Sequence, residues 1–105
     1  MTLTELYAII EARRGDDPAT SYVAKSFAKG RAKLAQKVGE EAVETVIAAI
    51  EGDRDAIISE SADLIFHLLM LWSDAGIAPA DVTAALEKRR GTSGLEEKAN
   101  RKEPG

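Results

Sequence analysis

Two groups of carboxylates stand where helix packing alone would favour Ala or Leu. The first is the stretch GEEAVET, with Glu40, Glu41 and Glu44. At 100° per residue, Glu41 and Glu44 share one face of a helix. The second group is ESAD, in which Glu60 and Asp63 have the same i, i+3 spacing. Such residues form either a solvated face with Lys–Glu pairs or a site that holds a cation.

Asp63 is hard to explain as an ordinary surface residue. It falls in the third turn of a helix expected to begin near residue 54, beyond the reach of the helix macrodipole. The apolar run LIF follows it directly. We therefore expect its side chain to lie in a partly buried place, where a carboxylate needs a partner.

The connection EGDRD between the two acidic segments is short, which predicts two adjacent antiparallel helices. Counted from Gly52, these four residues lie eight to eleven positions away, two on each side of the turn; they are Glu41, Glu44, Glu60 and Asp63. The four carboxylates can therefore converge, and they would raise one another's pKa values unless a cation lay between them.

The residue types favour a hard cation. The chain has no Cys and one His, which leaves oxygen ligands and favours Mg²⁺, with Mn²⁺ as a possible substitute. Zinc is disfavoured, and so is a ferritin-like di-iron site, since ESAD has Asp where that site needs His. Carboxylate-bound Mg²⁺ keeps positions open for substrate phosphates, so the pattern suggests catalysis.

His67 and the nearby lysines each have two interpretations. His67 lies one turn after Asp63 and is either a group that orients a carboxylate or water, or a core histidine bonded to a backbone carbonyl; we favour the second. Lys33 and Lys37 lie on the same stripe as Glu41 and either contact substrate phosphates or pair with the glutamates.

The periodicity predicts an all-α protein of four to five helices in a single domain, residues 1–105, with a basic tail at 91–105. The expected helices cover residues 2–14, 21–30, 31–51, 54–75 and 78–90. Thr2, Ser21 and Asp53 are expected N-caps. The longest candidate for an apolar run, LIFHLLMLW, contains His67 and is too short to span a membrane.

The helices at 31–51 and 54–75 are more apolar than a lone chain of this size requires. Val43, Ile47 and Ile50 widen the apolar face of the first well beyond one stripe, and the second is apolar all round near its end. Trp72 and Phe66 are expected in the core or at an interface. We predict a homo-oligomer, at least a dimer, assembled through these helices.

The charge distribution argues against nucleic-acid binding. Residues 38–87 carry eleven acids and one base, between basic segments at 13–37 and 88–105. An acidic centre does not offer the broad basic face that a duplex requires. The absence of Cys and of a cationic stretch before the first apolar residues predicts a cytoplasmic protein.

The pattern Glu-Glu-x-x-Glu followed by Glu-x-x-Asp resembles the MazG-like all-α nucleoside triphosphate pyrophosphatase superfamily. Within it, the segments SYVAKSFAKGRAKLAQKVGEEAVETVIAA, ESADLIFHLLMLW and LEKRRGTSGLEEKANRK are similar to the phosphoribosyl-ATP pyrophosphatase family. The resemblance covers nearly the whole chain. It implies Mg²⁺-dependent hydrolysis of phosphoribosyl-ATP to phosphoribosyl-AMP and pyrophosphate, the second step of histidine biosynthesis.

The resemblance also implies roles for individual residues. The implied metal ligands are Glu41, Glu44, Glu60 and Asp63. Glu40 would orient or deprotonate the attacking water. The candidate substrate-binding residues are Lys33, Lys37, Arg89, Arg90, Ser93, Gly94, Lys98 and Arg101. A solvated C-terminus remains the alternative for the residues of the tail.

Two other functions remain open at this stage. The same metal chemistry would suit a housekeeping pyrophosphatase that acts on canonical or damaged dNTPs, although such a substrate leaves the basic tail little to bind. A non-catalytic helical oligomerisation module would treat the acids as a solvated face, and it leaves Asp63 unexplained.

Overall fold

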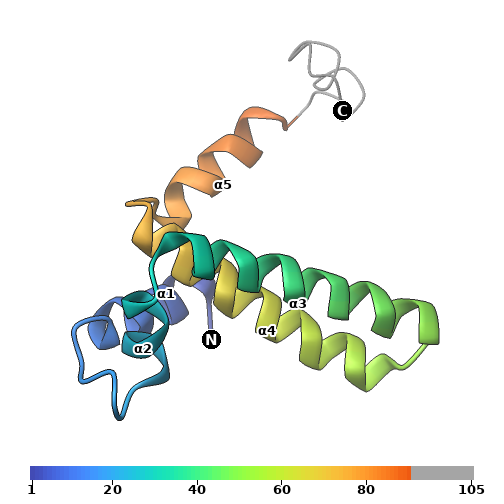
Figure 1. The fold of residues 1–105 in the computed structure, drawn as a ribbon. Helices are drawn as coiled ribbons and strands as arrows, with labels where there is room; N and C mark the ends of the chain where they lie inside the picture. Colours follow the sequence, from blue (N-terminus) through green and yellow to red (C-terminus); the bar gives the residue numbers. More distant parts are fainter. Residues whose placement is uncertain (91–105) are drawn as a thin grey trace.

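The computed structural model describes residues 1–90, and in that part of the chain it contains five α-helices and no strand (Figure 1). The all-α prediction is confirmed, with every predicted helix bound within two residues. The helices are α1 (Leu3–Arg13), α2 (Tyr22–Ala28), α3 (Arg31–Glu51), α4 (Arg54–Asp74) and α5 (Pro79–Lys88).

Side-chain caps begin three of these helices, as the sequence predicts. In each, the side-chain oxygen accepts the backbone N–H three residues further on, at 3.1 Å; the capping residues are Thr2, Ser21 and Asp53. Gly52 ends α3 with φ at +72°, a left-handed conformation that favours glycine. The chain can therefore turn within two residues and begin α4.

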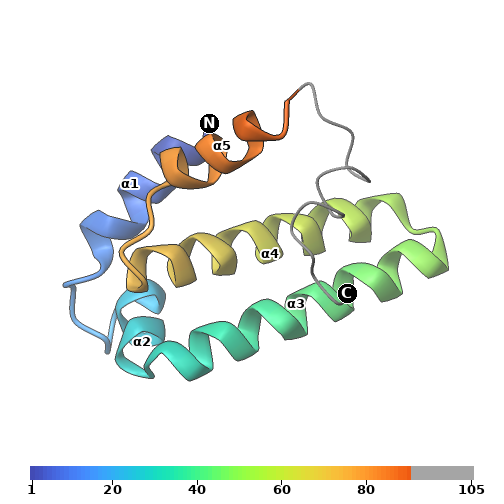
Figure 2. The ribbon, with the colours of Figure 1, turned by 90° about the horizontal axis from the view of Figure 1, so that it is seen from above.

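The pair α3 and α4 forms the frame of the molecule. These antiparallel 21-residue helices lie side by side in both views (Figures 1 and 2). The short α1 and α2 pack at the end of the pair opposite the Gly52 turn, and α5 lies beside α1 (Figure 2). The acidic segments of the sequence therefore face each other along α3 and α4.

The hydrophobic core lies at the end of the pair where α1 and α2 pack. Ile10, Leu69 and Met70 are fully buried, and Val23 and Leu34 are nearly so. Phe66 and Trp72 are partly buried against this cluster, which confirms that they belong to the core. The helices α1 to α4 all contribute side chains to this cluster.

The half of the pair nearest the Gly52 turn is different, because its apolar side chains are exposed. Val43, Val46, Ile47 and Ile50 on α3 have 45–83% of their surface open, and Ile58 on α4 has 53%. The broad apolar face predicted from the sequence is therefore present, and in a single chain it faces solvent.

Arg14 fixes α1 and α2 to the C-terminal end of α4. Its Nη1 donates to the backbone oxygen of Ser73 at 2.8 Å and to the Ser73 hydroxyl at 3.2 Å, and its guanidinium lies 4.5 Å from the centre of the Phe27 ring. Arg31 donates to Asp74 at 2.7 Å. Cations at the C-terminus of α4 also complement its dipole.

Helix α4 is long and apolar enough, by length and composition, to cross a membrane. The sequence-based expectation counted only uninterrupted apolar residues and so missed this. A single such helix is weak evidence for a membrane span, because core helices of globular proteins have the same composition.

Met70→Ala should lower the free energy of unfolding by about 2–5 kcal/mol, since a fully buried side chain would leave a cavity. Met70→Leu, which keeps the volume, should cost less than about 1.5 kcal/mol. Urea unfolding at one fixed protein concentration measures both values. Equal effects of the two substitutions would show that Met70 does not fill a packed core.

Candidate metal centre

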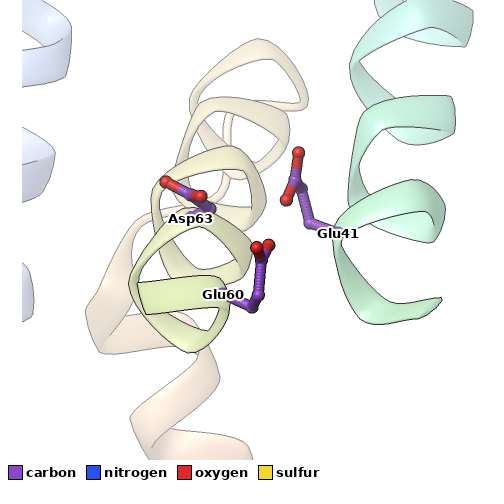
Figure 3. Close-up of side chains that lie close together, drawn as sticks. All are labelled: Glu41, Glu60 and Asp63. Atoms are coloured by element: carbon purple, nitrogen blue, oxygen red, sulfur yellow. The ribbon is translucent and has the colours of Figure 1, made fainter. Parts of the chain in front are cut away.

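Three carboxylates from the two acidic segments meet between α3 and α4. Glu41 reaches across from α3 towards Glu60 and Asp63 on α4 (Figure 3). One oxygen from each residue lies within 4.8 Å of the other two. Opposite oxygens around Mg²⁺ are about 4.2 Å apart, so small side-chain rotations would bring these three onto one ion. The donor set fits a hard divalent cation.

Glu44 lies outside this group of three, although the sequence predicts it as a fourth member. Its charge nevertheless acts on Glu60. Glu44 lies one helical turn from Glu41, about 4.5 Å further along the axis. It therefore lies beside the group and stays a predicted fourth ligand.

The surroundings of Glu60 disfavour the charged form of its carboxyl group. Partial desolvation raises its pKa above the usual value, and so do the charges of Glu41, Asp63 and Glu44 and a hydrogen bond shared with Glu41. A carboxyl group in this position is stabilised either by a proton or by a cation.

The prediction that the Asp63 side chain is partly buried is wrong. The sequence places its side chain in a partly buried position, whereas in a single chain the residue is exposed. Its apolar neighbours in the sequence point to other faces of the helix, because adjacent residues are 100° apart. Glu41 and Glu60 are the half-buried members of the cluster.

Lys37 and Glu40 extend the site along α3. The Nζ of Lys37 lies 3.5 Å from a carboxylate oxygen of Glu41 and 3.6 Å from one of Glu40. Burial lowers the pKa of Lys37, but Tyr22 and the two carboxylates outweigh it, so the pKa is raised. Gln36 donates to Glu40 at 2.9 Å and is the main cause of a lowered Glu40 pKa, with the nearby lysines contributing. Glu40 is therefore held as a carboxylate.

His67 is a buried histidine with both ring nitrogens bonded. Nδ1 lies 2.7 Å from the backbone oxygen of Asp63, and Nε2 lies 2.8 Å from the Tyr22 hydroxyl. A carbonyl oxygen only accepts, so Nδ1 carries a proton and Tyr22 donates to Nε2 in the neutral ring. The favoured interpretation, a core histidine bonded to a backbone carbonyl, is confirmed. Sequence reasoning missed Tyr22, since nothing local links residues 45 positions apart.

The predicted substrate-binding residues are dispersed. Lys33 donates to Gln36 at 3.3 Å. Arg90, just after α5, forms an ion pair with Glu87 at 2.7 Å. Arg89 beside it is also exposed and also takes part in an interaction. The remaining four lie outside the described residues; they are Ser93, Gly94, Lys98 and Arg101.

Comparison with known proteins gives one consistent result. The family model described as phosphoribosyl-ATP pyrophosphohydrolase matches residues 3–90. A phosphoribosyl-ATP pyrophosphatase from Azospirillum brasilense is 61% identical over 95% of this chain and 90% of its own. Proteins with the same name from Rhizorhabdus wittichii and Paramagnetospirillum magneticum are 61% and 57% identical, over 95% and 94% of this chain and 94% and 91% of their own.

Mg²⁺ should raise the melting temperature of the wild-type protein by about 3–8 °C at saturation, because it relieves the repulsion around Glu60. Glu60→Gln should melt higher than wild type without metal and gain less from Mg²⁺. Differential scanning fluorimetry, with KCl matched in ionic strength, measures both shifts. Glu51→Gln, which removes an acid on α3 outside the cluster, serves as the control. An equal Mg²⁺ response in all three proteins would contradict a cation site here.

Proposed function

Because this chain belongs to the phosphoribosyl-ATP pyrophosphohydrolase family, we propose that it hydrolyses phosphoribosyl-ATP to phosphoribosyl-AMP and pyrophosphate, the second step of histidine biosynthesis. At residue level, the observation that supports this reaction is the meeting of Glu41, Glu60 and Asp63 on facing helices. A metal held there by carboxylates would leave positions open for phosphate oxygens.

The cofactor in this proposal is Mg²⁺, with Mn²⁺ as a substitute. Glu41, Glu60 and Asp63 would hold it, and Glu44 would join them after a change of side-chain conformation. When bound, the ion stabilises the charge that develops on the leaving pyrophosphate. The raised pKa of Glu60 supports this assignment, because desolvation and the neighbouring carboxylates both disfavour its charged form and a bound cation would favour that form.

Glu40 is proposed to orient the attacking water. Its pKa is lowered by Gln36 and by the nearby lysines, so it stays ionised and accepts hydrogen bonds. A strong general base would need a pKa closer to neutrality. Of the two roles open from the sequence, orientation of the water fits this environment better than removal of its proton.

The basic residues divide between the two ends of the substrate. Lys33 and Lys37 extend from the carboxylates along α3 and would contact the triphosphate. Arg89 and Arg90 follow α5, which packs against α1, and they lead into the tail. We propose that they contact the phosphoribosyl end, together with the tail residues predicted from the sequence.

We further propose that two or more copies assemble through the exposed apolar face of α3 and α4, which comprises Val43, Val46, Ile47, Ile50 and Ile58. An exposed face of this composition is unfavourable in a monomer. We propose that the chain forms a single domain. We also propose that the enzyme is located in the cytoplasm, where its phosphorylated substrate would be made.

Asp63→Asn should lower kcat/KM for phosphoribosyl-ATP at least about a hundredfold, because one negative ligand is lost where charge develops. Pyrophosphate release with and without Mg²⁺, with NTPs and dNTPs as competing substrates, measures the effect and the specificity. Asp81→Asn on α5 is the control and should keep full activity. Full activity of Asp63→Asn would remove the metal site from the proposal. A preference for dNTPs would keep the site and replace the substrate.

Ile47→Glu combined with Ile50→Glu should shift the protein to monomers, because two charges cannot be buried unpaired in an apolar interface. Leu86→Glu, at an exposed apolar residue of α5, should leave the assembly unchanged. Sedimentation velocity over a range of concentrations distinguishes them. A wild-type protein that sediments as a monomer at every concentration would contradict the interface.

A further inference from the structure

We propose that a lysine-lined pocket beside the carboxylates binds the terminal phosphate of the substrate's triphosphate. This inference rests on the proposed function and adds the position of the leaving pyrophosphate. The pocket has a volume of about 70 Å³ and lies between α2, α3 and α4. That is room for a few water molecules or one phosphate group, and too little for a purine with its ribose.

Three lysines supply the charge of the pocket. Lys29 comes from the end of α2, and Lys33 and Lys37 come from the first two turns of α3; no carboxylate belongs to the lining. Lys29 forms no ion pair with another residue in the range 1–90, and Lys33 has only the amide oxygen of Gln36. Lys37 already has the carboxylates of Glu40 and Glu41 beside it, so the charges of Lys29 and Lys33 are the ones left for an anionic ligand.

The other polar groups of the lining already donate hydrogen bonds within the protein. The Ser26 hydroxyl donates to the backbone oxygen of Tyr22 at 2.8 Å, and one N–H of the Gln36 amide donates to Glu40 at 2.9 Å. The Tyr22 hydroxyl donates to His67. The lysine ammonium groups are therefore the main donors left for a ligand, beside the second N–H of Gln36, and they recognise charge more than shape.

Residues of both α3 and α4 connect the pocket with the candidate metal centre. On α3, Lys33, Lys37 and Glu41 follow one another at intervals of four residues, so that about 6 Å separates each from the next. Lys37 belongs to both places, because it lines the pocket and pairs with Glu41. On α4, His67 lines the pocket and bonds to the backbone oxygen of Asp63.

This arrangement determines in which direction the triphosphate of the substrate runs from the carboxylates. With the bond to be cut at the carboxylates, the next phosphates along the chain reach Lys37 and then the space between Lys29 and Lys33. The phosphate of the phosphoribosyl group lies on the other side of the purine and would point away from the pocket. The pocket therefore holds the group that leaves as pyrophosphate.

Binding of tripolyphosphate by isothermal titration calorimetry, with EDTA present, tests the pocket without any assumption about activity. Lys29→Gln and Lys33→Gln should each weaken binding by about five- to tenfold, because each removes a charge-assisted hydrogen bond. Lys25→Gln, an exposed lysine of α2 outside the lining, should bind as wild type does. Added KCl should weaken wild-type binding more than that of Lys29→Gln.

Kinetics with phosphoribosyl-ATP then test the direction. Lys29→Gln should raise KM and the inhibition constant of pyrophosphate by a similar factor, with kcat little changed, while inhibition by ribose 5-phosphate stays the same. Lys29→Arg should restore most of the binding, and circular dichroism checks that each variant is folded.

Three results would overturn the inference. Equal tripolyphosphate binding by Lys25→Gln, Lys29→Gln and Lys33→Gln would show that the pocket is not an anion site. Loss of inhibition by ribose 5-phosphate alone would place the other end of the substrate there. A fall in kcat with KM unchanged would show that Lys29 acts only in the transition state and does not bind the phosphate of the bound substrate. Lysine-dependent binding of tripolyphosphate in a protein that does not hydrolyse phosphoribosyl-ATP would support the pocket and reject the substrate.

Discussion

The mutual repulsion of Glu41, Glu60 and Asp63 is the constraint on which the rest of this structure depends. Bringing three carboxylates within 4.8 Å of one another costs free energy, and the pKa of Glu60 is raised by partial desolvation and by the charges of its neighbours. The cluster therefore requires a rigid frame that holds the three side chains together. Two long helices joined by a tight turn provide that frame, and packing elsewhere supplies the stability.

The stabilising packing is separated from the cluster along the same two helices. Ile10, Leu69 and Met70 are buried where α1 and α2 pack, and Arg14 joins three of the elements there. His67 lies at the border between the two regions. Its ring is buried in the core, while its Nδ1 contacts the backbone of a carboxylate residue. Core packing and site geometry are thus coupled through a single side chain.

Much of this arrangement follows from local patterns, and what does not follow has identifiable reasons. Caps at Thr2, Ser21 and Asp53 and the helical periodicity predict the helices, and the short turn with i, i+3 spacing predicts that Glu41, Glu60 and Asp63 meet. The place of Glu44 depends on the register of two helices to within a turn, which no local pattern specifies. The exposure of Asp63 follows from its angle on the helix rather than from its neighbours in sequence. The Tyr22–His67 bond and the position of Lys29 depend on how α2 packs, a long-range effect.

The turn at Gly52 has a consequence for how the chain can change in length. Asp53 caps α4 directly after this turn, so one residue added inside α4 before Glu60 would shift Glu60 and Asp63 against Glu41 by about 1.5 Å and 100° and turn them away from it. One residue added to the exposed loop at 15–20 would lengthen a surface connection and leave both long helices in place. Insertions and deletions should therefore be tolerated in that loop and excluded between the turn and the carboxylates, although both segments lie largely at the surface.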